Sequence, residues 1–209
     1  MEPIVKQATL NDLGAIARIH VDCWREIYTF VPETVHQARN LTVRYEQWEE
    51  VVVADRPNER LWSVWLDEKI VGFAHANDAG DKDIPEARAL FNAAYFTPAV
   101  RKQNVGVYVM DAMIQFATGA DLWPACLWAF EKNPGRSRNA AAGWQEVCRR
   151  DRTIEGIAVP EVGYLSPADP NTLYAKMNLK LQTAGARTQP SPTVEHPDQE
   201  LPQENQLPR

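Results

Sequence analysis

Apolar residues recur along the chain at two spacings, and each spacing predicts a different element. Between residues 13 and 27 they fall three or four positions apart, as on one face of a helix: Leu13, Ile16, Ile19, Cys23 and Ile27. Thr9 precedes this face and Asp12 follows three residues later, which is the pattern of a helix N-cap with its capping-box partner. A second helix is expected over residues 42–52, after a short helical turn at 32–37, and should bury Val43, Trp48 and Val51.

Short apolar runs bounded by polar turns predict strands. Residues 61–66 and 70–75 flank the turn Asp67-Glu68-Lys69, and this composition is typical of a β-hairpin. A polar loop is expected at 79–85. Further strands are expected at 4–8, 93–96, 125–130 and 153–165. A helix that begins near Asn104 and ends at Gly119 would separate the middle two.

The composition describes one soluble globular domain. Of the 209 residues, 44% are hydrophobic and 24% are charged, which are ordinary proportions for such a domain. The apolar runs are too short for a membrane protein, and no secretion signal is recognisable, so we expect a cytoplasmic location. Three widely spaced cysteines, an odd number, favour reduced thiols and predict neither a disulfide nor a metal site.

Charge argues against nucleic acid as a partner. The net charge is −6 and the chain has no basic stripe, whereas binding to phosphate backbones needs clustered Lys and Arg. One basic cluster stands late in the chain, at Arg136, Arg138, Arg149, Arg150 and Arg152. We interpret it as a solvated face; the alternative, for Arg136 alone, is a contact to the phosphates of a cofactor.

The composition changes after residue 165. From Gln189 onward the chain is rich in Pro, Gln and Glu and has few large apolar residues, so it cannot bury enough surface to offset chain entropy. We therefore expect a folded domain at 1–166 and a disordered tail at 167–209. Residues 173–181 suit either a short helix or a strand.

The stretch from Asn92 to Thr118 carries the main chemical signal. An apolar strand at 93–96 is followed by Thr97-Pro98, by the polar turn Arg101-Lys102-Gln103-Asn104, and by Gly106 at the start of a helix. The first amides of a helix lack intrahelical partners and carry partial positive charge, so a turn of this kind can hold a phosphate or pyrophosphate. Arg101 and Lys102 add formal charge at the same place.

At these residues the chain resembles the GNAT family of acetyl-CoA-dependent N-acetyltransferases. The family's pyrophosphate loop reads Arg or Gln, two variable residues, Gly, one variable residue, then Gly or Ala, and residues 101–106 match it except at Asn104, where Gly is usual. Asn enters the left-handed backbone region cheaply, so the turn can survive. Three further stretches resemble the family: residues 8–32, the hairpin phrase Ile70-Val71-Gly72-Phe73, and residues 127–133.

The resemblance implies an α/β (α+β) fold: a mixed, mostly antiparallel central sheet flanked by helices, the GNAT acyl-CoA N-acyltransferase fold. Acetyl-CoA would be the co-substrate, without a metal, and the activity an acyltransferase (EC 2.3.1.-). Its phosphates would sit on the amides of Gln103 to Val107, with Arg101 and Lys102 adding charge. Tyr95 and Phe96 would supply backbone groups beside the pantetheine arm, and Asn133 would meet that arm or the far end of the cofactor. The set is Tyr95, Phe96, Arg101, Lys102, Gln103, Asn104, Val105, Gly106, Val107, Asn133 and Arg136.

The acceptor side is less defined by the resemblance. The acceptor would be a primary amine of a small molecule or a peptide, with a homodimer left open. Trp24 is either core or a wall of the acceptor pocket, and His75 faces either the pocket or solvent. The family's usual acid, a Tyr, is replaced by Ala140 or Ala141, and its frequent strand Glu maps near Leu90. Glu131 is the first candidate for the catalytic carboxylate, with Glu86 and Asp83 as alternatives.

Two other functions remain open at this point. The substitution at Asn104 and the missing Tyr and Glu also suit a catalytically weak or inactive relative that binds CoA or acyl-CoA as a regulatory ligand. A third interpretation makes the acidic, Pro-rich tail a docking segment for a protein partner and the domain a scaffold.

Overall fold

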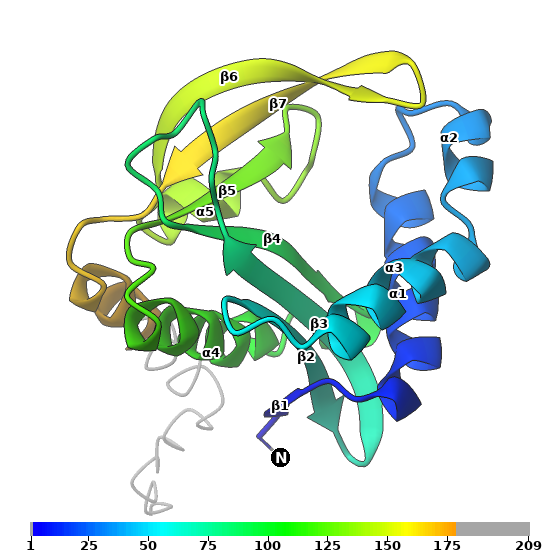
Figure 1. Cartoon of the computed structure of the whole chain (residues 1–209), viewed down its shortest axis with the longest axis horizontal. Coiled ribbons are helices and arrows are strands. Elements are labelled where there is room, and N and C mark those ends of the chain that lie inside the picture. The colour runs from blue at the N-terminus through cyan, green and yellow to red at the C-terminus, as the bar shows by residue number, and fades with distance from the viewer. Residues whose placement is uncertain (1, 179–209) are drawn as a thin grey trace, which may run out of the picture.

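A computed structural model describes residues 2–178 of the chain. Seven strands form one sheet in the order β1-β2-β3-β4-β5-β7-β6 (Figure 1). Neighbouring strands are antiparallel except β4 and β5, which are parallel. The strands are β1 (Ile4–Gln7), β2 (Glu59–Leu66), β3 (Lys69–Asp78), β4 (Ala89–Phe96), β5 (Ala125–Phe130), β6 (Gln145–Ile154) and β7 (Ile157–Leu165).

Helices cover both faces of this sheet (Figure 1). Within residues 2–178 the helices are α1 (Leu13–Ile27), α2 (Glu33–Ala38), α3 (Leu41–Ala54), α4 (Val105–Gly119) and α5 (Ser137–Ala141), followed by a helical segment at 171–178, with short 3-10 turns at Leu10–Asp12 and Pro98–Val100. Helix α4 packs on one face, and α1 and α3 pack on the other. This is the mixed, mostly antiparallel arrangement flanked by helices that the sequence predicts. Within residues 2–178 no helix is both long and apolar enough to cross a bilayer.

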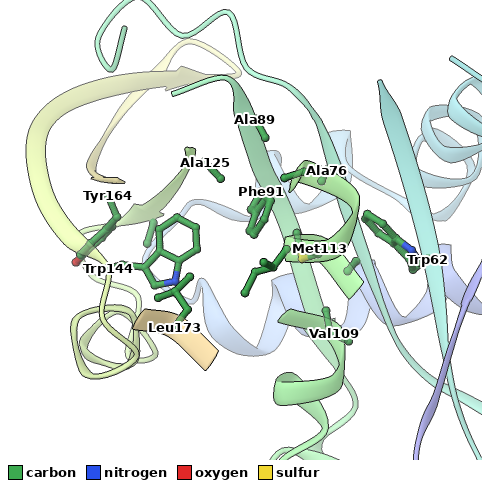
Figure 2. Close-up of a cluster of buried hydrophobic side chains, with 14 of the residues drawn as sticks. Trp62, Ala76, Ala89, Phe91, Val109, Met113, Ala125, Trp144, Tyr164 and Leu173 are labelled. Carbon is green, nitrogen blue, oxygen red and sulfur yellow. The ribbon is translucent and has the colours of Figure 1, made fainter. Parts of the chain in front are cut away.

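The larger core cluster lies between α4 and the sheet. Figure 2 shows the two sides of this cluster meeting, with side chains of α4 directed onto those of β4 and β5. Its labelled members are Trp62, Ala76, Ala89, Phe91, Val109, Met113, Ala125, Trp144, Tyr164 and Leu173. Leu173 is only 1% exposed and belongs to a helical segment at 171–178. Core packing therefore continues beyond residue 166, where the sequence suggested the domain ends; the segment from Gln189 onward lies outside the described residues.

The first helix has the predicted boundaries and inner face. The backbone N–H of Thr9 donates to Oδ2 of Asp12 at 2.9 Å, which confirms that side of the capping box. Four of the five residues of the apolar repeat are buried in α1: Leu13, Ile16, Ile19 and Cys23. Aliphatic residues at this spacing need only one apolar surface to pack on, and β3 and β4 supply most of it.

Helix α3 differs from the prediction in which residues it buries. Val43 is 41% exposed, whereas Trp48 is 1% and Arg44 only 4% exposed. Asn40 caps this helix by accepting from the backbone N–H of Val43 at 3.2 Å, which places Val43 in the solvent-facing first turn. The next residue, Arg44, then faces the interior, so this turn of the helix buries a cationic side chain.

Strand β6 begins at Gln145, eight residues before the expected start. The sequence from 145 to 152 is dominated by charged residues and reads as a turn, yet these residues pair with β7 from Gln145 opposite Leu165 onward. Because β6 is the last strand in the sheet order, its side chains reach solvent on much of their surface, and charges are tolerated there.

The sheet opens between β4 and β5. These two strands pair only at Ala89 with Ala125 and Leu90 with Cys126, and they diverge beyond those pairs (Figure 1). The register of β4 against β3 also shifts beside His75. Ala89 and Phe91 consequently pack under α4, whereas Ala93 and Tyr95 pack under α1.

Candidate active site

The turn that enters α4 has the left-handed residue its sequence pattern requires. Asn104 has φ 58° and ψ 16° and is the N-cap residue of α4. The structure thus uses Asn where the family pattern has Gly, because the short amide side chain tolerates this conformation. The chain reaches Asn104 from β4 through the 3-10 turn at Pro98–Val100.

Four backbone amides at this turn are free to bind an anion. Within residues 2–178, the N–H groups of Lys102, Asn104, Val105 and Gly106 donate to no backbone acceptor. They precede or open α4, whose dipole places partial positive charge at the same end. The predicted set was Gln103 to Val107. The N–H of Gln103 instead donates to the carbonyl of Val100 at 3.0 Å, and that of Val107 to the carbonyl of Asn104 at 2.9 Å.

Arg101 does not extend its charge toward this turn. Its Nε donates to the carbonyl oxygen of Phe96 at 2.9 Å, and its two terminal nitrogens bind the carboxylate of Glu26 at 2.6 and 2.7 Å. The guanidinium thus ties the end of β4 to α1, and it lowers the pKa of Glu26. Of the predicted cationic pair, Lys102 is the exposed one.

The diverging edge of β4 presents Ala94 and Phe96. The N–H of Thr97 donates to the carbonyl of Val71 in β3 at 2.8 Å, so by strand alternation the backbone groups of Tyr95 also face β3. Those of Ala94 and Phe96 face the opening toward β5. The sequence predicted that the backbone groups of Tyr95 and Phe96 would face this opening. Because alternate residues of a strand face opposite neighbours, Ala94 takes the place of Tyr95.

Aromatic side chains fill the opening on the α1 face. The indole N–H of Trp24 donates to the hydroxyl of Tyr95 at 3.1 Å, and the hydroxyls of Tyr28 and Tyr95 are also 3.1 Å apart. Trp24 is 7% exposed and packs with Tyr28 and Phe130, so it is part of the core beside this opening. Asn133 lies at the edge of this cluster, where its Oδ1 accepts from the backbone N–H of Gly135 at 2.8 Å.

A cavity of about 630 Å³ lies on the same face of the sheet, beside β4, β5 and β6. Its lining residues are Lys82, Asp83, Leu90, Asn92, Trp128, Arg150, Asp151 and Arg152. Sequence reasoning placed Leu90 near the site and proposed Asp83 as a carboxylate. The cavity residues of β6 were not predicted, because their run of charged residues is typical of a turn. The same run is also compatible with an edge strand, and that interpretation would have identified them.

His75 is an internal residue that positions Asn92. It is 3% exposed, and its Nε2 lies 3.0 Å from Oε1 of Glu59 while its Nδ1 lies 3.1 Å from Nδ2 of Asn92. Burial lowers the pKa of His75, although Glu59 opposes this shift. The neutral ring then donates from Nε2 to Glu59 and accepts from the Asn92 amide, which holds the Asn92 side chain at the cavity wall.

The structure does not bring the two predicted catalytic carboxylates to the cavity. Glu131 forms an ion pair with Arg149 of β6 at the surface. Glu86 is exposed in the loop before β4. Neither lines the cavity. Glu131 directly follows β5, and there its carboxylate is bound by Arg149 of β6.

Arg136 also has protein partners. Its Nη1 donates to the hydroxyl of Tyr164 at 3.1 Å and to Glu146 at 3.3 Å. Arg150 carries more contacts than a solvated residue would: it binds Glu161 at 2.7 Å and Asp83 at 2.8 Å, and its guanidinium carbon lies 3.6 Å from the ring centre of Trp128. Three members of the basic cluster, Arg136, Arg149 and Arg150, therefore form ion pairs on β6 and its neighbours, whereas Arg152 lines the cavity.

Comparison with known proteins agrees with this geometry. A GCN5-related N-acetyltransferase from Rhodopseudomonas palustris superposes with a TM-score of 0.63 at 15% identity, covering 79% of this chain and 96% of that one. The PaiA N-acetyltransferase from Thermoplasma acidophilum, in complex with coenzyme A, gives 0.61 at 14% identity, covering 77% and 98%. The ribosomal-protein-alanine N-acetyltransferase from Brucella melitensis gives 0.58 at 14% identity, covering 78% and 98%.

These identities establish a shared fold. No curated protein sequence matches the chain significantly. The model of the acetyltransferase (GNAT) family matches residues 14–139, which is more than half of the chain and includes α1, the diverging strand β4 and the turn into α4. The chain belongs to the GNAT acetyltransferase family.

Proposed function

We propose that this protein transfers the acetyl group of acetyl-CoA to the nitrogen of a primary amine by direct attack. The observation that carries the proposal is the turn at the start of α4, where the four free amides of Lys102, Asn104, Val105 and Gly106 face no protein acceptor within residues 2–178. A pyrophosphate group suits such a set of donors. The PaiA N-acetyltransferase, whose structure is a complex with coenzyme A, shares the overall fold.

The opening between β4 and β5 suits the arm that would carry the thioester. Ala94 is exposed at this edge, and the backbone groups of Ala94 and Phe96 point into it, so the N–H of either residue can polarise a thioester carbonyl. Because the carbonyl of Phe96 is already bound by Arg101, that part of the edge is held in place before a ligand arrives.

The cavity on the α1 face would hold the amine. The amine nitrogen forms a bond to the acetyl carbon, the carbon–sulfur bond breaks, and the thiolate takes a proton from water, as a thiol of pKa near 8.5 permits. The amine must lose one proton. Of the carboxylates in the cavity wall, Asp83 pairs with Arg150 at 2.8 Å, whereas Asp151 forms no ion pair within the described part of the chain.

We assign Asp151 the role of accepting that proton, directly or through water. Asp151→Asn should then lower kcat by about 10²-fold or more, the usual contribution of a positioned base. The dissociation constant of acetyl-CoA should stay unchanged, since the cofactor turn lies at the start of α4. A kcat within a few fold of wild type would remove Asp151 from the mechanism.

Thermal unfolding with and without acetyl-CoA tests the binding half of the proposal. A ligand at a hundredfold excess over its dissociation constant stabilises the folded protein by about 2.7 kcal/mol. Gly106→Glu places a carboxylate among the free amides and should abolish this stabilisation. Gly106→Ala is the matched control, because a Cβ atom there lies 3.9 Å from Phe96 in ordinary contact.

A binding protein without turnover is the second candidate. Helix α5 carries Ala140 and Ala141 where the family's usual acid stands, and the predicted carboxylates lie away from the cavity. Stabilisation by acetyl-CoA with no CoA release across a broad amine panel would favour this candidate over the enzyme.

A further inference from the structure

Arg44 is a buried cation, and three of its five N–H donors have no partner among the described residues. It lies in the first turn of α3 and is 4% exposed. Its Nη1 donates to Oε1 of Gln47 at 2.7 Å. Its Nε and Nη2 are buried and have no partner among residues 2–178. These two nitrogens share one edge of the guanidinium, the edge that binds a carboxylate with two parallel hydrogen bonds.

A second arginine converges on the same place. The guanidinium carbons of Arg39 and Arg44 lie 5.1 and 5.0 Å from the ring centre of Trp24. The Nε of Arg39 is also buried and unpartnered within the described residues. The carboxylate of Glu155 lies 3.9 Å from Arg39, at the tip of the β6–β7 hairpin. Among the described residues no carboxylate forms an ion pair with Arg44.

This arrangement opposes the charged state of both groups. Burial, followed by the neighbouring charge of Arg39, lowers the pKa of Arg44 to about 10. Burial and the charge of Arg152 lower the pKa of Arg39. The other groups facing the pair supply no anion: burial and the two arginines keep His20 neutral, and burial raises the pKa of Tyr95 and Tyr28. Buried charges without a partner are rare in folded proteins and need an explanation.

Trp24 and Arg152 connect the arginine pair to the region where the amine would react, although neither Arg39 nor Arg44 lines the cavity itself. Trp24, which both guanidinium groups cover, donates to the hydroxyl of Tyr95 on the diverging part of β4. Arg152 lines the cavity and also lies within electrostatic range of Arg39 and Arg44. These residues are on the α1 face of the sheet, whereas the free amides stand at the start of α4, which covers the other face.

We propose that the acceptor is an amine that carries a carboxylate, and that the Nε–Nη2 edge of Arg44 binds this carboxylate with Arg39 beside it. The proposal deepens the proposed function and rests on it for the role of the amine. Trp24 supplies the flat surface on which both guanidinium groups stack. The substrate class is then that of free amino acids and related amino carboxylates, in preference to simple alkyl amines.

The test compares amino acids with their amides, which differ only in the carboxylate. Thermal unfolding is measured for the full chain with a panel of free amino acids, the matched amides and inorganic phosphate, each with and without CoA. At least one amino acid should raise the melting temperature of the wild type, and its amide should not. CoA release from acetyl-CoA is measured on the same panel.

Two variants locate the effect. Arg44→Gln should remove the stabilisation by the amino acid and lower kcat/KM for it by about 30- to 1,000-fold, mainly through KM, as expected for the loss of a buried charge pair. Arg39→Gln should act in the same direction and covers the case in which Arg44→Gln does not fold. Arg88→Gln removes an exposed arginine that pairs with Asp121 and should change neither quantity.

The outcomes separate the two proposals. Amides or alkyl amines that match the amino acids in stabilisation and CoA release would overturn the carboxylate site and leave the transferase standing. Stabilisation by phosphate with none by any amino acid would also overturn it. Stabilisation by an amino acid but not by acetyl-CoA would support the carboxylate-binding site and overturn the proposal that the protein is a transferase.

Discussion

Gly72 of β3 and Phe96 of β4 face each other so closely that only glycine fits. A Cβ atom on Gly72 would lie 2.5 Å from Cδ1 of Phe96 and 2.8 Å from the carbonyl oxygen of Tyr95. The Phe96 ring in turn lies beside Gly106 at the start of α4. This contact fixes how the end of β4 approaches the turn with the free amides.

Gly72→Ala should therefore destabilise the protein by about 1–3 kcal/mol, the usual cost of overpacking. It should also weaken binding of acetyl-CoA, because Phe96 and the carbonyl of Tyr95 must move. Urea unfolding and calorimetry measure the two effects. Gly14→Ala in α1 is the control: a Cβ atom there meets nothing within 4 Å, and alanine should leave the protein as stable or up to about 1 kcal/mol more stable.

Asn104 gives a second prediction, since its backbone is left-handed. Asn104→Val should cost about 1–2 kcal/mol, the strain of a branched residue in this region. Asn104→Gly should keep or raise stability and bind acetyl-CoA at least as tightly, because no side chain then stands beside the free amides. Weaker binding by the glycine variant would show that the asparagine side chain itself contacts the ligand.

The ion pair between Arg150 and Glu161 predicts a large mutational effect. The Glu161 side chain is 1% exposed and accepts from Nε of Arg150 at 2.7 Å. Arg150→Met would strand a buried carboxylate and should cost about 3 kcal/mol in the free energy of unfolding. Adding Glu161→Gln to that variant should recover part of the loss. A double variant no more stable than Arg150→Met would mean that the lost Trp128 stacking dominates.

Two buried histidines predict how stability depends on pH. Burial lowers the pKa of His20 and of His75 below the usual 6.5. The unfolded chain therefore binds more protons than the folded protein below about pH 6.5, and stability falls as pH decreases from there toward the folded pKa values. Each group contributes a slope of up to about 1.4 kcal/mol per pH unit.

Denaturant unfolding between pH 8 and pH 5 measures this slope. His20→Gln keeps a hydrogen-bond acceptor for the indole of Trp48, which donates to Nδ1 of His20 at 3.1 Å, and removes one titrating group. The slope should become smaller in this variant. An unchanged slope would contradict the assignment of His20 as a neutral buried residue.

Local patterns were enough to predict most of the fold. The capping residues Thr9 and Asp12, the apolar face of α1 and the hairpin at Asp67-Glu68-Lys69 each depend on interactions within a few positions, and the structure has all three. The left-handed turn at Asn104 belongs to the same class, because one residue type and its backbone preference decide it.

The residues of the proposed acceptor side could not be predicted because their positions depend on contacts between distant segments. Arg44 faces inward only because Asn40 caps α3 and sets its rotation. Glu131 is removed from the site by Arg149, a residue of a strand that the charged sequence conceals. Polar residues in the interior carry no periodic signal of their own, so Arg39, Arg44 and Asn92 emerge only from the packed structure.

Release of CoA from acetyl-CoA in the presence of amines tests whether this protein transfers acetyl groups. The protein should release CoA and form an equal amount of N-acetylated product with at least one amino acid, and Gly106→Glu should do neither, whereas Gly106→Ala should retain both. Binding of acetyl-CoA without CoA release above the rate of hydrolysis, across amino acids, peptides and alkyl amines, would show that the protein is not an acetyltransferase.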